Sequence, residues 1–133
     1  MAETFAKMAE QAISQANAVE ANQALQILED DLNALLVDVR DESEVDATGI
    51  GVRAIHAPGR SIAWMADLDS DYRSEELKDR SRRVLTTCGG SPCYRGASAA
   101  NVLTRMGFTD ASFVEGGMAA LRAAGIETKR REA

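Results

Sequence analysis

The chain has 133 residues, the size of one ordinary domain with a single hydrophobic core. Its 21 acidic residues outnumber 15 Lys and Arg, and the formal charge of -6 disfavours non-specific binding to nucleic-acid phosphates. It lacks a run of about 20 apolar residues that could span a membrane, and residues 1–7 lack the basic and apolar segments of a secretion signal. We therefore expect a cytoplasmic protein that binds neither nucleic acid nor membranes.

Two helical patterns open the chain. Apolar residues recur at helical spacing over residues 3–17, which predicts an amphipathic helix that packs on the domain. A second pattern covers residues 21–28 and ends at the acidic run 29–31. The expected parts of the chain are an N-terminal helical extension at 1–20, the main domain at 21–126 and a polar tail at 127–133.

The rest of the chain alternates short apolar runs with helical segments. The runs expected to form strands are residues 35–39, 53–57, 83–87 and 111–114. The segments expected to form helices are a short one after Asp41 and those at 61–65, 96–106 and 118–124. The acidic stretch from Asp67 onward is expected to be a solvated loop. This order predicts an α/β domain with a mainly parallel central sheet and helices on both faces.

Both cysteines lie in one loop between a predicted strand and a predicted helix. In open α/β sheets, ligands bind at the carboxyl ends of the strands. The following helix directs its positive end at the loop and Arg95 adds a charge, so we expect Cys88 to ionise readily. The small residues after Cys88 allow backbone amides to form a nest for an anion. The candidate site is the nucleophile Cys88 with the anion-binding loop Gly89, Gly90, Ser91, Pro92, Cys93, Tyr94 and Arg95.

The residues of this loop also allow less reactive roles. Cys88 alternatively acts as a small buried apolar residue, with the glycines forming only a turn. Cys93 either attacks an oxidised or persulfidated Cys88 to form a disulfide, or only occupies the loop. Two cysteines and the single His56 do not supply a four-ligand zinc site, so we expect no metal and no cofactor.

Four segments resemble the single-domain rhodanese-like sulfurtransferase family, and together they cover most of residues 35–125. They are residues 36–42, 51–58, 84–88 followed by 95–108, and 114–125. The resemblance implies a rhodanese-like fold and transfer of sulfane sulfur through a persulfide on Cys88. It implies a small donor, thiosulfate or a persulfide, and a thiophilic acceptor such as cyanide, glutathione or a thiol protein. Arg95 would orient the loop or the donor, and Arg60 is a further substrate contact, while Asp38 and Arg40 are expected to form a structural pair.

The loop departs from the family pattern. Six residues separate Cys88 from Arg95, whereas single-domain rhodaneses usually have four and the related cell-cycle phosphatases five. Three classes of function therefore follow from the sequence: a sulfurtransferase, a non-catalytic rhodanese-like binding or redox-sensing module, and a cysteine-based phosphatase or arsenate reductase. No general acid is evident near the loop, which disfavours the phosphatase. The sulfurtransferase is the function we expect.

Overall fold

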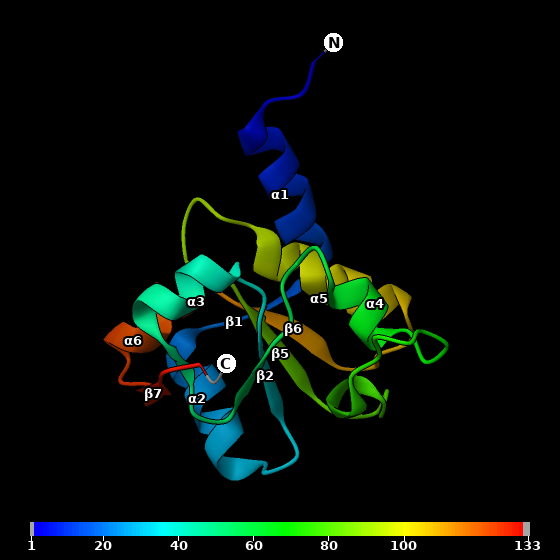
Figure 1. Ribbon diagram of the computed structural model, residues 1–133. Helices are drawn as coiled ribbons and strands as arrows, with labels where there is room; N and C mark the ends of the chain where they lie inside the picture. The colour runs from blue at the N-terminus through cyan, green and yellow to red at the C-terminus, as the bar shows by residue number, and fades with distance from the viewer. Residues whose placement is uncertain (1, 132–133) are drawn as a thin grey trace.

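We describe residues 2–131 of a computed structural model of the chain (Figure 1). Residue 1 of the expected extension and residues 132–133 of the expected tail lie outside this range. The strands are β1 (Asn17–Val19), β2 (Leu35–Asp38), β3 (Ile50–Gly51), β4 (Ala54–His56), β5 (Val84–Thr87), β6 (Ala111–Val114) and β7 (Thr128–Lys129). The helices are α1 (Phe5–Gln15), α2 (Ala21–Asp30), α3 (Glu42–Thr48), α4 (Ile62–Ala66), the 3-10 helix η1 (Glu75–Leu77), α5 (Arg95–Arg105) and α6 (Gly117–Ala123).

Five strands form the central sheet in the order β1-β6-β5-β2-β4, and β5 lies in the middle. The neighbouring strands of this sheet run parallel. Strands β2, β5 and β6 are buried along their whole length, as expected for short apolar runs covered on both faces. The predicted α/β fold with a parallel central sheet is confirmed.

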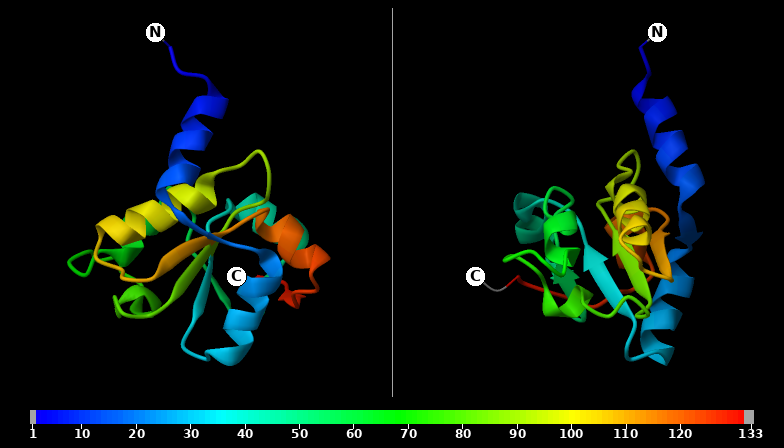
Figure 2. Two further views of the ribbon diagram at one scale, coloured as in Figure 1. Left: turned by 180° about the vertical axis from the view of Figure 1, so that it is seen from behind. Right: turned by 90° about the vertical axis from the view of Figure 1, so that its right-hand side faces the viewer.

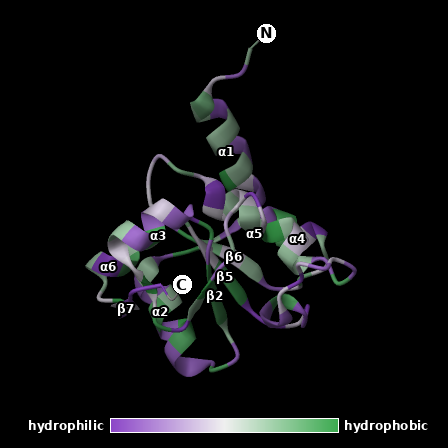
Figure 3. Cartoon of the chain, in the orientation of Figure 1, coloured by the Kyte–Doolittle hydropathy of each residue, from purple (hydrophilic) through white to green (hydrophobic). Residues whose placement is uncertain are grey.

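Helices cover both faces of the sheet. Alternate side chains of β2 point to opposite faces. Leu35 belongs to a core cluster that includes Ile62 of α4 and Leu103 of α5. Leu36 belongs to a second cluster, which includes Leu28 of α2 and Leu121 of α6. Figure 3 shows the same arrangement, with mainly hydrophobic strands at the centre of the molecule.

The segment between the first two helices is a strand that the sequence did not indicate. Residues 17–19 form β1, which pairs with β6 so that Ala18 lies opposite Phe113. This strand has three residues and two of them are exposed, so it carries no apolar run that periodicity could detect. The central sheet therefore begins inside the segment expected to be an N-terminal extension.

The C-terminal segment also pairs with the domain. Strand β7 runs antiparallel to β3, with Ile50 opposite Lys129. Arg131 adds an ion pair with Asp46 at the end of the described range, with Nε 3.0 Å from Oδ1. Residues 128–131, expected to belong to a polar tail, thus contact the domain through a two-stranded sheet and one surface ion pair.

Helix α1 extends away from the body of the domain and leads into β1 (Figure 2). Thr4 caps its start, because the Thr4 Oγ1 accepts a hydrogen bond from the Lys7 backbone N–H at 3.1 Å. Near its C-terminal end, the Ala12 carbonyl accepts a hydrogen bond from Asn101 of α5 at 3.0 Å. No helix between residues 2 and 131 combines the length and the apolar character that a membrane crossing requires.

Candidate functional site

Cys88 follows β5 directly, so the thiol lies at the carboxyl end of the middle strand of the sheet. It is buried, with 5% of its surface exposed. The Thr86 hydroxyl donates to the Gly96 carbonyl at 2.6 Å and ties β5 to the first turn of α5. A Cβ at Gly96 would lie 3.6 Å from the Cys88 sulfur, so the first turn of α5 packs directly against the thiol.

The loop after Cys88 is held by the first turn of α6. The backbone N–H of Met118 donates to the Cys88 carbonyl at 2.7 Å, and that of Ala119 donates to the Gly89 carbonyl at 3.1 Å. Gly117 has a φ of +56°, and a Cβ there would clash with the Cys88 carbonyl and lie 2.8 Å from the Gly90 nitrogen. The loop can rest on α6 only because residue 117 lacks a side chain.

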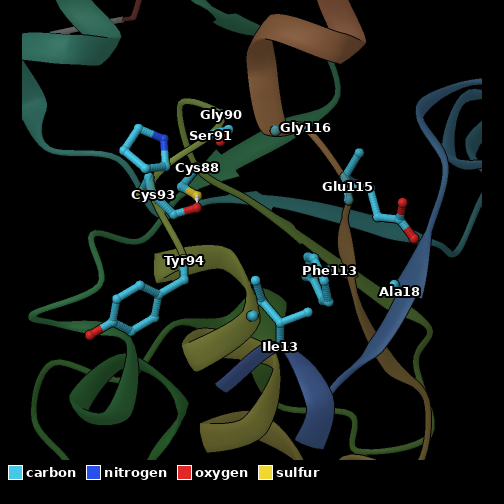
Figure 4. Close-up of a pocket in the computed structure, with 14 residues that line it drawn as sticks. Ile13, Ala18, Cys88, Gly90, Ser91, Cys93, Tyr94, Phe113, Glu115 and Gly116 are labelled. Carbon is cyan, nitrogen blue, oxygen red and sulfur yellow. Dashed lines mark hydrogen bonds between the residues drawn. The ribbon is translucent and has the colours of Figure 1, made fainter. Parts of the chain in front are cut away.

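The loop folds back and brings its two cysteines together. The backbone N–H of Cys93 donates to the Gly90 carbonyl at 2.8 Å and closes a turn. The Cys88 Sγ lies 3.6 Å from the Cys93 carbonyl oxygen. Figure 4 shows both side chains at the same cavity. Both thiols are free in this structure.

Arg95 contacts the sulfur of Cys93. The Arg95 Nε lies 2.9 Å from the Cys93 Sγ, and the Arg95 backbone N–H donates to the same sulfur at 3.4 Å. The guanidinium also pairs with Glu44 of α3 at 2.9 Å and lies 3.5 Å from Asp41. Burial raises the pKa of Glu44, but the Asp41 backbone N–H and Arg95 outweigh it, so this pKa is lowered. Arg95 therefore contacts the Cys93 sulfur and two carboxylates.

Of the two thiols, Cys93 ionises more readily, because its pKa is lowered and that of Cys88 is raised. Burial raises the pKa of Cys88 to about 11, although the backbone N–H groups of Gly96 and Gly90 favour its thiolate. Burial also acts to raise the pKa of Cys93, but the hydrogen bonds from Arg95 outweigh it and this pKa is lowered. The expectation that Cys88 ionises readily was wrong, because Arg95 reaches the second cysteine and Cys88 is buried.

An Arg95→Gln variant is expected to shift the pH at which Cys93 becomes half ionised upward. The folded protein lowers the pKa of Cys93, so its thiolate persists below the usual pH range of a thiol, and removing the cation reverses this. At neutral pH, alkylation of Cys93 by iodoacetamide should slow by about tenfold or more. Peptide mapping across a pH series measures the midpoint. Arg60→Gln, which removes an arginine that contacts Glu42, is the control, and equal midpoints in the two variants would contradict this prediction.

A cavity of about 390 Å³ opens beside the two cysteines (Figure 4). Ile13 of α1, Ala18 of β1 and Phe113 of β6 form an apolar wall. Among the described residues that line the cavity, Glu115 alone carries a carboxylate or a cationic group. Sequence reasoning missed this wall, because α1 and β1 reach the site only through the fold.

The predicted loop residues are divided between two cavities. The residues of the loop that line the cavity beside Cys88 are Gly90, Ser91, Pro92, Cys93 and Tyr94. Gly89 is placed outside this lining, with its carbonyl bonded to α6. Arg60 and Arg95 line a neighbouring cavity of about 330 Å³. Arg60 is exposed and pairs with Glu42 at 2.7 Å.

Asp38 and Arg40 form a buried ion pair at the end of β2, with Nη2 2.8 Å from Oδ2. The Arg40 guanidinium also donates to the Thr48 hydroxyl at 2.6 Å and to the Gly49 carbonyl at 2.8 Å. The His56 Nε2 lies 2.7 Å from the Arg40 carbonyl oxygen. These contacts attach β2 to the C-terminal end of α3, the helix that carries the Glu44 partner of Arg95.

A thiol at the carboxyl end of a middle strand, followed by a glycine-containing loop and a helix, defines a cysteine-centred α/β domain. Residues 20–124 match the model of the Rhodanese-like domain, and the chain belongs to this family. The family resemblance inferred from the sequence is confirmed. No curated protein sequence matches the chain.

Solved structures share the fold at low sequence identity. A protein of unknown function from Rhodopseudomonas palustris CGA009, described as a possible tyrosine phosphatase, has a TM-score of 0.85 and 22% identity, with 97% of this chain and 96% of that chain covered. The polysulfide-sulfur transferase homodimer of Wolinella succinogenes has a TM-score of 0.75 and 23% identity, covering 96% and 88%. A rhodanese-like domain from Anabaena sp. has a TM-score of 0.69 and 24% identity, covering 86% and 79%.

Proposed function

We propose that this protein is a sulfurtransferase that moves sulfane sulfur through a persulfide on Cys88. The observation that carries the proposal is the thiol pair beside the cavity, in which the buried Cys88 thiol lies 3.6 Å from the Cys93 carbonyl oxygen and the Arg95 Nε lies 2.9 Å from the Cys93 sulfur. Membership of the rhodanese-like family supports this chemistry. The neighbour from Wolinella succinogenes is a polysulfide-sulfur transferase, and this chain shares its fold.

The thiol pair lets Cys88 act as a nucleophile despite its burial. As the Cys88 sulfur attacks the outer sulfur of a donor, its proton passes to the Cys93 thiolate. The sulfur–sulfur bond of the donor breaks, and the leaving group departs with the electron pair. The backbone N–H groups of Gly90 and Gly96 then stabilise the new persulfide. A thiol or cyanide attacks the outer sulfur, and Cys88 leaves and recovers its proton.

The cavity favours a donor with an apolar group and little negative charge. Its described lining contains apolar side chains and the carboxylate of Glu115, while Arg95 and Arg60 line the neighbouring cavity. A dianion such as thiosulfate meets no cation there and is repelled by Glu115. An organic persulfide or a thiosulfonate with an aryl group places its apolar part against Ile13 and Phe113. The same charges disfavour phosphate monoesters, and thus the phosphatase.

Parallel turnover assays test this function and its rivals. We expect the kcat/KM for benzenethiosulfonate with cyanide to exceed that for thiosulfate with cyanide by about tenfold, since partial burial of an aryl ring contributes about 1.4 kcal/mol. Under the same conditions, p-nitrophenyl phosphate should release no phenolate above background. Turnover of the aryl phosphate alone would assign the protein to the phosphatases. The absence of turnover with all three compounds would assign it to the non-catalytic modules.

A further inference from the structure

We propose that Cys93 gives the domain a second activity, the reduction of sulfane sulfur to sulfide. Resting on the proposed function, this step begins from the Cys88 persulfide. Cys93 attacks the inner sulfur of that persulfide, hydrosulfide leaves, and a disulfide joins Cys88 to Cys93. The persulfide therefore has two outcomes: transfer to an acceptor, or internal reduction when the cavity holds no acceptor.

The loop geometry places the attacking sulfur against its target. The Cys88 Sγ lies 3.6 Å from the Cys93 carbonyl oxygen, and both residues line the same cavity. The turn closed between Gly90 and Cys93 keeps this approach within a single loop. Both cysteines lie between the end of β5 and the start of α5, so the two reacting sulfurs belong to one loop.

Arg95 supplies the charge that the second attack needs. After sulfur uptake Cys93 carries the proton from Cys88, and this proton must reach the outer sulfur of the persulfide, directly or through solvent, before Cys93 can act. The Arg95 Nε at 2.9 Å from its sulfur favours the thiolate again. Cys93 is only partly buried, so the proton has a route to solvent.

The basicity of the two possible leaving groups decides which sulfur of the Cys88 persulfide Cys93 attacks. In thiol–disulfide chemistry, the thiolate of lower basicity leaves faster. Attack on the outer sulfur would expel the Cys88 thiolate, and burial raises the pKa of Cys88 to about 11. Attack on the inner sulfur expels hydrosulfide, the anion of a much stronger acid. Internal attack by Cys93 is therefore directed to sulfide release and disulfide formation.

The reaction balances with one donor and one dithiol. The donor loses its sulfane sulfur to Cys88, its leaving group departs as an anion with the electron pair, and the proton of Cys88 passes through Cys93 to the departing hydrosulfide. That sulfur then gains the two electrons released when the Cys88 and Cys93 thiols become a disulfide, and it departs as sulfide. A dithiol reductant, either a small molecule or a protein with a paired thiol, returns the disulfide to two thiols and completes the cycle.

The test uses fully reduced protein, benzenethiosulfonate in slight excess, and neither acceptor nor reductant. The amount of benzenesulfinate released measures sulfur uptake, and the amount of sulfide released measures internal reduction. Intact mass shows whether the cysteines are thiols, a persulfide or a disulfide. We expect wild-type protein to release one benzenesulfinate and one sulfide per chain and to lose the mass of two hydrogen atoms. Dithiothreitol should then restore the starting mass and permit a second round.

The Cys93→Ser and Cys93→Ala variants are expected to release benzenesulfinate without sulfide and to retain one sulfur atom on the peptide containing Cys88. End-point amounts are compared, because loss of Cys93 also slows uptake. Wild-type protein that retains a stable Cys88 persulfide beside a free Cys93 would overturn the reductase proposal and leave the transferase intact. Sulfur found on Cys93 would overturn it as well. The absence of benzenesulfinate from all three proteins would reject the proposed function together with this step.

Discussion

A Cys88→Ser variant is expected to take up no sulfur from benzenethiosulfonate and to lose at least about a thousandfold of the sulfurtransferase rate, because a hydroxyl cannot form the persulfide. Serine occupies nearly the same volume and can keep the contact with the Cys93 carbonyl oxygen, so the fold should persist. Intact mass measures sulfur uptake, and the cyanide assay measures turnover.

Thermal unfolding provides the control for the Cys88→Ser variant, since a melting temperature close to that of the wild type separates lost chemistry from lost structure. Cys93 remains in this variant, and Arg95 still contacts its sulfur. Full turnover with the sulfur bound to Cys93 would show that the second cysteine is the sulfur carrier. That outcome would contradict the role proposed for Cys88.

The part of the fold that sequence could predict is the part built from buried apolar runs. Residues 35–39, 83–87 and 111–114 were expected to be strands, and β2, β5 and β6 lie in these ranges. These strands are covered on both faces, so their composition alone distinguishes them from surface segments. The position of the loop after residues 83–87 could also be predicted, because a glycine-containing loop between a strand and a helix lies at the carboxyl edge of the sheet.

The parts that sequence could not predict depend on pairing partners distant in the chain. Strands β1, β3 and β7 have two or three residues each, and their place is set by their partners. Sequence periodicity needs a longer run than these provide. The apolar wall of the cavity was missed for the same reason, since Ile13 and Ala18 reach it through the pairing of β1 with β6.

The sequence predicted that Arg95 would place a positive charge beside a thiol of the loop, but it indicated the wrong cysteine. Sequence reasoning assigned the positive charge of Arg95 to Cys88, the first cysteine of the loop. In the structure the loop turns between Gly90 and Cys93, so the guanidinium meets the second sulfur instead. Glu44, which shares the charge, lies 51 positions before Arg95, and α3 brings it to the site. Such contacts are a property of the folded chain rather than of local spacing.

An Asp38→Asn variant is expected to lose about 3–5 kcal/mol of unfolding free energy, because it leaves Arg40 as an uncompensated buried charge. The asparagine preserves volume and one oxygen acceptor, so the change removes mainly the negative charge. Urea unfolding followed by far-ultraviolet circular dichroism measures the loss. We also expect slower alkylation of Cys93, because Arg40 holds the C-terminal end of α3 through Thr48 and Gly49, and α3 carries the Glu44 partner of Arg95.

The Asp110→Asn variant is a matched control for burial. Arg83 and Asp110 also lie 2.8 Å apart, but their side chains are 44% and 45% exposed, so removing this pair should lower the unfolding free energy by about 1 kcal/mol or less. Equal losses in the two variants would contradict the structural role of the Asp38–Arg40 pair. A much larger loss for Asp38→Asn, accompanied by slower alkylation of Cys93, would show that the end of β2 supports the charge on the loop through α3 and Glu44.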